Sequence, residues 1–132
     1  MPASVDVWVA SVDPAADGRA AAGAAERARA SRFASDDSRR RWLAGRAVLR
    51  RVLGAVLGVA PEAVDLHEEP GGRLVLSTDV GVHFSLSRAA DLVVVAVADR
   101  PVGVDVEVDR RLVRPGPLAD RLIEDPAERR RW

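Results

Sequence analysis

Short apolar segments recur along this chain, several of them alternating with polar positions, and they predict strands. They are residues 5–12, 64–67, 73–76, 82–86 and 92–98. The last segment is apolar at nearly every position, which is typical of a central strand that is covered on both faces. Turn-forming residues separate the segments, with Asp-Pro at 13–14 and Pro-Gly-Gly at 70–72. The middle of the chain onward is therefore expected to be mostly sheet.

Helical patterns lie between the first strand and the others. Residues 20–33 are rich in helix formers. Ser35 and the two aspartates after it offer an N-cap and first-turn acids for a longer helix that reaches about Val56, with its exit at Gly58. The residues at three- and four-residue steps predict its buried stripe: Trp42, Leu49, Val52, Leu53 and Val56. The arginines are expected to lie largely off that stripe: Arg39, Arg40, Arg46 and Arg50.

Composition suits one small domain over residues 1–132, with 48% hydrophobic and 30% charged residues. Twenty basic residues balance twenty acidic ones, so neither nucleic acid nor an anionic membrane is an expected partner. There is no cysteine, which excludes disulfides and thiolate metal sites. The apolar runs are too short to cross a bilayer, and a cytoplasmic location is expected.

The segment 102–108 has the most distinctive pattern, because valines alternate with a glycine and two carboxylates. In a strand, Asp105 and Glu107 would share one face and the valines the other. Their backbone positions would be roughly 6 to 7 Å apart, close enough for one hard cation to bind between the carboxylates. Gly103 would leave room for a ligand beside Asp105. The alternative is an ordinary half-buried strand whose carboxylates are only solvated.

Four motifs occur together in this chain. Residues 84–89 read Phe-Ser-Leu-Ser-Arg-Ala and precede the hydrophobic strand, and residues 102–107 read Val-Gly-Val-Asp-Val-Glu. A basic helix covers 41–50, and Gly-Gly-Arg stands at 71–73. Together these motifs resemble those of the surfactin-type phosphopantetheinyl transferases, in the order in which that family has them. The resemblance implies an α+β fold, a half-domain in which a largely antiparallel sheet packs against a long helix.

That resemblance also implies Mg²⁺-dependent transfer of 4′-phosphopantetheine from coenzyme A to a serine of an acyl or peptidyl carrier protein. Asp105 and Glu107 would hold the metal and serve catalysis, since Mg²⁺ prefers carboxylate and phosphate oxygens. Four residues would hold the coenzyme A phosphates, the last two from a polar loop around 85–91: Arg41, Arg73, Ser87 and Arg88. Guanidinium groups and hydroxyls suit phosphate oxygens. The general base is unassigned, with Glu128 as one candidate.

The chain departs from the family pattern at several positions. Ser85, Arg88 and Ala89 stand where the family has Asn, His and Ser, and arginine in place of histidine loses a group that titrates near neutral pH. Short helices are expected at 118–123 and 127–132, and the family's second, pseudo-symmetric half would follow them. The chain is therefore interpreted as a truncated N-terminal half. The alternative function is a non-catalytic remnant that folds or binds carrier protein, and a homodimer is expected to cover the exposed edge.

Overall fold

The computed structural model describes residues 4–13 and 23–107, so Glu128 and the helices predicted at 118–123 and 127–132 lie outside the described residues. The described elements are, in chain order, β1 (Val5–Ser11), α2 (Ala24–Ala30), α3 (Asp36–Leu57), the 3₁₀ helix η1 (Pro61–Ala63), β2 (Leu66–Glu68), β3 (Leu74–Leu76), β4 (His83–Ala89) and β5 (Leu92–Ala98). Their strands pair antiparallel, which confirms the α+β class. Within the described ranges, no helix is both long and apolar enough to span a membrane.

The long helix α3 begins and ends close to where the sequence predicts. The hydroxyl of Ser35, its N-cap, accepts a hydrogen bond from the backbone N–H of Ser38 at 3.1 Å. Gly58 ends the helix with a φ of 71°, a left-handed conformation that glycine adopts without steric cost. Four of the predicted stripe residues are buried: Trp42, Leu49, Val52 and Leu53. Val56 is 41% exposed, so its predicted burial is wrong; the core on α3 ends at Leu53, one turn before the helix does.

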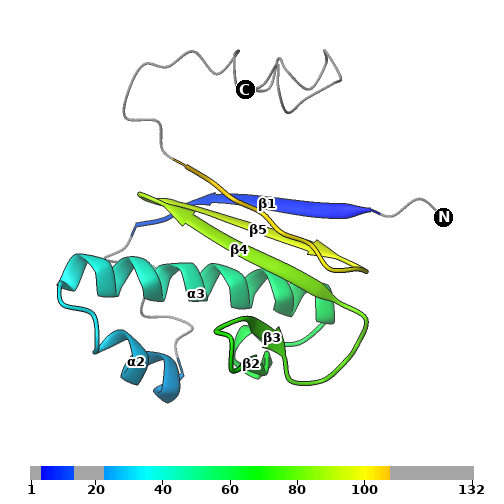
Figure 1. The fold of residues 1–132 in the computed structure, drawn as a ribbon, viewed down its shortest axis with the longest axis horizontal. Coiled ribbons are helices and arrows are strands. Elements are labelled where there is room, and N and C mark those ends of the chain that lie inside the picture. The colour runs from blue at the N-terminus through cyan, green and yellow to red at the C-terminus, as the bar shows by residue number, and fades with distance from the viewer. Residues whose placement is uncertain (1–3, 14–22, 108–132) are drawn as a thin grey trace, which may run out of the picture.

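The three-stranded sheet has the order β1-β5-β4, and α3 lies along one of its faces (Figure 1). Strand β5 is central and buried from Val93 to Ala98, as its apolar sequence predicts. Every second residue of β5 joins a core with Phe84 of β4 and the apolar side of α3, including Leu49 and Leu53. We call the sheet face away from α3 the outer face. Strands β2 and β3 form a separate two-stranded sheet.

Strand β4 extends through residues that the sequence assigns to a loop. The prediction is a strand over 82–86 and a polar loop around 85–91, whereas β4 pairs with β5 as far as Ala89. Ser87 and Arg88 therefore lie in a strand, and their placement on a loop is wrong. The physical reason is that polar and apolar side chains alternate along β4, and its serine hydroxyls find hydrogen-bond partners on the outer face.

Helix α2 packs beside α3 and is shorter, within the described residues, than the predicted 20–33. Its Glu26 is buried and pairs with Arg50 of α3, whose side chain is only 12% exposed. The Nη1 atom of Arg50 also donates to the carbonyl oxygens of Pro61, at 3.2 Å, and of Val64, at 2.6 Å. Arg50 is thus largely buried, whereas the sequence predicts that it lies largely off the buried stripe. Its side chain connects α3 to α2 and to the segment before β2.

Candidate functional site

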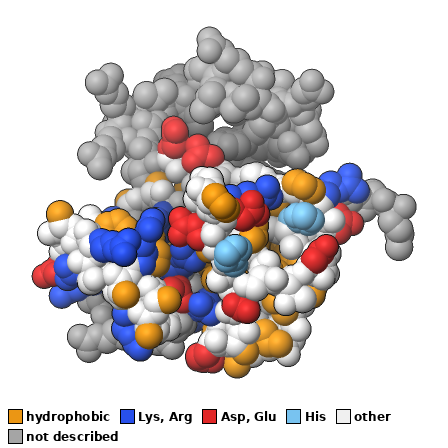
Figure 2. All heavy atoms as spheres, turned by 60° about the horizontal axis from the view of Figure 1, so that its bottom comes forward, with side chains coloured by type: hydrophobic (Ala, Val, Ile, Leu, Met, Phe, Trp, Pro, Cys, Tyr) orange, Lys and Arg blue, Asp and Glu red, His pale blue; other side chains and the backbone are white. Residues whose placement is uncertain are grey.

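An open groove between α3 and β4 contains two adjoining pockets of about 460 and 340 Å³. Trp42, Leu86 and Arg88 line both pockets and so lie between them. The arginines of the groove come from α3, β4 and the turn before β3: Arg41, Arg46, Arg73 and Arg88. On the side of the molecule that carries α2 and the β2–β3 hairpin, basic and acidic side chains are interspersed (Figure 2). The groove is therefore distinguished by four arginines that line it, one of which, Arg41, is paired with acidic residues.

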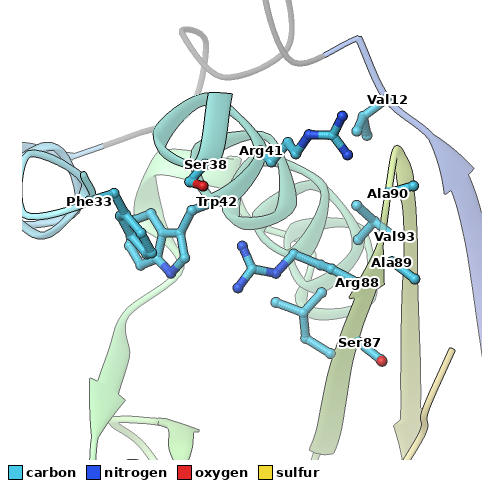
Figure 3. A pocket seen from close by; sticks show the side chains of 11 residues that line it. Val12, Phe33, Ser38, Arg41, Trp42, Ser87, Arg88, Ala89, Ala90 and Val93 are labelled. Carbon is cyan, nitrogen blue, oxygen red and sulfur yellow. The ribbon is translucent and has the colours of Figure 1, made fainter. Parts of the chain in front are cut away.

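Arg88 reaches into the groove from β4, and its guanidinium group points toward Trp42 of α3 (Figure 3). Its stem runs over Gly45, because a Cβ atom added to Gly45 would lie 2.5 Å from the Cδ atom of Arg88. Arg88 is exposed as a whole residue, but partial burial of its charged group lowers its pKa from the ordinary value, since the charged form loses part of its hydration. An arginine remains cationic at working pH. The partly desolvated charge of Arg88 is therefore well placed to bind an anion.

Arg46 is a groove residue that the sequence reasoning missed. Its guanidinium carbon lies 4.7 Å from the centre of the Trp42 ring, a cation–π contact. Burial lowers the pKa of Arg46, the nearby Glu26 raises it and Arg88 lowers it further. Arg46 and Trp42 are four residues apart, which places them on the same side of a helix, and this spacing is the signal that could have found Arg46.

Arg41 and Arg73 both lie at the groove, but in different pockets. Arg41 lines the first pocket and forms ion pairs with Asp37, at 2.9 Å, and with Asp91, at 3.4 Å. Arg73 is exposed and lines the second pocket just before β3. The structure therefore brings Arg41, Arg73 and Arg88 to one groove, as their shared predicted role requires. Asp37 and Asp91 are acidic partners with which an anion at Arg41 would compete.

The segment 101–107, which we call the acidic segment, is extended, but it is not the strand that the sequence predicts. The expected alternation is present: Val102, Val104 and Val106 are half-buried, whereas Asp105 and Glu107 are exposed. The backbone N–H groups of Val104 and Val106 donate to the hydroxyls of Ser85, at 3.1 Å, and of Ser87, at 3.0 Å. Because the acceptors are side chains of β4 rather than its carbonyls, the segment lies against the outer face and adds no strand to the sheet.

Ser87 and Arg88 point to opposite faces, as successive residues of a strand must. The hydroxyl of Ser87 points away from Arg88 and Trp42 (Figure 3), although Ser87 contributes to the lining of the first pocket. That hydroxyl donates to the Oδ1 atom of Asp105 at 3.2 Å. The structure thus separates the predicted site residues into the groove arginines and an outer-face group of Ser87, Asp105 and Glu107.

Asp105 and Glu107 have the donor chemistry that Mg²⁺ prefers. Both carboxylates are exposed and stand two residues apart on an extended segment, so they project to the same side. Mg²⁺ usually takes one or two carboxylates and completes its shell with substrate phosphates and water. Among residues 4–13 and 23–107, no three or more His, Cys, Asp or Glu side chains are grouped as a metal site. The two carboxylates therefore fit a magnesium ion that is shared with a phosphate-bearing ligand.

Comparison with known proteins relates this chain to one family of enzymes. No protein-family model matches it. It is 41% identical over 86 residues to the 4′-phosphopantetheinyl transferase HetI of a Nostoc species, a match that covers 62% of this chain and 36% of HetI. It is 33% identical over 111 residues to the 4′-phosphopantetheinyl transferase psf-1 of Bacillus pumilus, which covers 79% of this chain and 48% of psf-1. The chain is thus similar in sequence to two 4′-phosphopantetheinyl transferases, which supports the family resemblance that its motifs show.

The chain spans about a third to a half of the length of these curated relatives. Both relatives are named as transferases, which supports an enzyme family for this chain.

Proposed function

We propose that this chain serves the transfer of 4′-phosphopantetheine from coenzyme A to a serine hydroxyl of an acyl or peptidyl carrier protein. The observation that carries the proposal is its similarity to two proteins named 4′-phosphopantetheinyl transferases. The matched lengths, 36% and 48% of those relatives, support assigning the chain to one half of such an enzyme, the N-terminal half by its motifs.

The arginine groove supports binding of coenzyme A. Planar guanidinium groups match phosphate oxygens, and Arg41, Arg73 and Arg88 face one groove from three different elements. Burial disfavours the charged form of Arg88 and of Arg46, so an anionic ligand would offset a cost that is already present in the free protein. We assign these arginines to the phosphates of coenzyme A. We do not assign Ser87 to these phosphates, because its hydroxyl points away from the groove (Figure 3).

Asp105 and Glu107 would hold a magnesium ion beside β4, on the segment whose Val102 also lines the second pocket of the groove. When bound, the ion supplies charge neutralisation to phosphate oxygens, which favours attack at phosphorus. The chain's own residues orient the donor: the arginines hold the phosphates, and the hydroxyls of Ser85 and Ser87 hold the acidic segment against β4. The general base remains unassigned. The expected cytoplasmic location and the absence of nucleic-acid and membrane partners stay predictions from sequence.

The test is calorimetric titration of coenzyme A into the purified chain, with and without Mg²⁺. Wild type is compared with Asp105→Ala and with Asp99→Ala, which removes an exposed aspartate that pairs with its neighbour Arg100. We expect Mg²⁺ to strengthen binding in wild type and in Asp99→Ala, and to have no effect in Asp105→Ala. A carrier-protein transfer assay would follow.

Two results would contradict the proposal. A folded sample that binds no coenzyme A would favour a non-catalytic remnant. Binding that Mg²⁺ strengthens equally in Asp105→Ala would remove Asp105 from the metal site while leaving the arginine groove in place. Circular dichroism of each variant establishes that the sample is folded.

A further inference from the structure

We infer that Ser87 is a positioning residue for Asp105 and does not bind phosphate, and that Ser85 and Ser87 together fasten the acidic segment to the sheet. The metal part of this inference rests on the proposed function. The fastening of the segment does not, because it follows from hydrogen bonds within the chain. Ser87 thus takes a role different from the one its motif position implies.

The two serines occupy alternate positions of β4 and therefore project from the same face. Phe84, Leu86 and Arg88 project from the other face, toward α3 and the groove. The spacing of the serines matches that of their partners, because an extended segment repeats its N–H direction every second residue. Ser85 accepts from Val104 and Ser87 from Val106. The hydroxyls of these two serines thus serve as the acceptors that backbone carbonyls would supply in a paired strand.

The hydroxyl of Ser87 makes two bonds, and both go to the acidic segment. It accepts from the backbone N–H of Val106 at 3.0 Å and donates its proton to the Oδ1 atom of Asp105 at 3.2 Å. A hydroxyl has one proton to donate. With that proton committed to Asp105, Ser87 has none to offer a phosphate oxygen, and its direction away from Arg88 agrees with this (Figure 3).

One hydroxyl therefore constrains two adjacent residues. The bond to Val106 holds the backbone, and the bond to Asp105 selects one orientation of the carboxylate next to it. A carboxylate whose rotamer is already set loses less conformational freedom when it binds a cation. Among the described residues, the hydroxyl of Ser85 bonds to the backbone of Val104 and to no carboxylate, so it holds the segment without orienting one. This difference makes Ser85 an internal reference for Ser87.

The first experiment is amide hydrogen exchange, measured residue by residue by NMR on the full chain without ligand. In Ser87→Ala we expect the exchange of the Val106 N–H to accelerate on the order of tenfold, with Val104 little changed. In Ser85→Ala we expect the reverse. Ser87→Thr keeps the hydroxyl and a good strand former, so it should behave as wild type. Ser11→Ala, an exposed serine of β1, is the matched control.

The second experiment consists of two titrations of the full chain. In one, Mn²⁺ is the probe cation and is added in the presence of coenzyme A; in the other, coenzyme A is added without metal. We expect Ser87→Ala to bind Mn²⁺ roughly tenfold more weakly, Ser87→Thr to restore the affinity, and Ser85→Ala to have a smaller effect. We expect the metal-free affinity for coenzyme A to be the same in Ser87→Ala and wild type. A structural defect alone would lower both affinities. Weaker binding of Mn²⁺ with unchanged metal-free binding of coenzyme A therefore identifies a positioning role.

Each remaining result has a definite meaning. Unchanged exchange of Val106 in Ser87→Ala overturns the fastening, and a weaker metal-free affinity for coenzyme A in that variant overturns the positioning role, because the hydroxyl would then contact phosphate. If wild type binds neither Mn²⁺ nor coenzyme A, the proposed function fails, and the exchange data alone decide whether the two serines hold the segment.

Discussion

Single residues decide how the arginine groove is built. Arg88 crosses α3 only because position 45 has no side chain, so the position of its charge depends on a glycine that carries no chemistry of its own. A second helical glycine, Gly54, faces backbone instead, since a Cβ there would lie 2.7 Å from the carbonyl oxygen of Val59. The Arg88 side chain next to Gly45 can move, whereas the Val59 backbone next to Gly54 cannot. The two glycines are therefore expected to respond differently to the same substitution.

We predict that Gly45→Ala leaves the fold intact but displaces Arg88. Alanine favours a helix interior by about 1 kcal/mol over glycine, which offsets the cost of moving the arginine stem. Affinity for coenzyme A should fall roughly tenfold, and titration calorimetry would measure it. Gly54→Ala should instead lower the free energy of unfolding by about 1–3 kcal/mol, because the backbone of Val59 cannot yield. Unchanged affinity in folded Gly45→Ala would contradict the prediction.

A second prediction concerns pH. Arg88 stays cationic between pH 5 and 8, whereas a histidine has a pKa of about 6.5, and burial beside Arg46 would lower it. In Arg88→His the positive charge is present at low pH and lost as pH rises through this lowered pKa, so metal-free binding of coenzyme A should weaken relative to wild type from pH 5 to pH 8. Taking the ratio to wild type cancels the titration of the ligand phosphate. Arg88→Lys, which stays charged, is the control, and a ratio independent of pH would contradict the prediction.

At the scale of elements, one buried ion pair connects α2, α3 and the η1 region, none of which belongs to the three-stranded sheet. Arg50 of α3 bonds to Glu26 of α2, to the carbonyl oxygen of Pro61 in η1 and to that of Val64 just after η1. The side chains of Arg50 and Glu26 are only 12% and 9% exposed. Removing Arg50 would leave a buried carboxylate and two carbonyls without these donors. A buried charge without a partner costs far more than an exposed one.

We predict that Arg50→Ala lowers the free energy of unfolding by about 3 kcal/mol. Arg51→Ala is the matched control, since Arg51 is the next residue of α3 and is exposed. That variant should stay within about 0.5 kcal/mol of wild type. Urea unfolding followed by circular dichroism measures both values. Equal, small effects of the two substitutions would show that the pair does not hold α2 to α3.

At the scale of the whole molecule, the two faces of the sheet have different partners. The inner face packs on α3 and borders the groove, and the outer face receives the acidic segment over β4. Strand β1 is at the sheet edge within the described residues, and three of its valines are exposed: Val5 by 49%, Val7 by 54% and Val9 by 67%. Apolar residues on an edge strand favour association.

The expected homodimer gives a prediction for this face. Sedimentation equilibrium over a concentration series should show a mass that rises above the 14.1 kDa of one chain. Val7→Lys should shift the equilibrium toward monomer, because a charge on an edge strand opposes pairing. Val80→Lys alters a similarly exposed valine, 51% accessible, outside the helices and strands, and should not shift it. A compact monomer at every concentration in wild type would contradict the expected dimer.

The local features of this protein were predictable from sequence. The strand β5, the caps of α3 at Ser35 and Gly58, and the alternation of valines and carboxylates around Asp105 agree with the prediction. These features depend on side-chain periodicity and on the conformational preferences of single residues, which act over a few positions. The family resemblance was predictable as well, because it rests on short motifs. The roles of individual motif residues were harder to assign.

The sequence by itself therefore determined the order of elements and the acidic pattern, whereas tertiary structure decided which partner each polar side chain meets. It placed Ser87 beside Asp105 rather than beside Arg88, and it brought Arg46 into the groove and Arg50 to Glu26. The physical reason is that these contacts join residues far apart along the chain. They depend on how the sheet, α3 and the acidic segment pack together, and local periodicity contains no information about that packing.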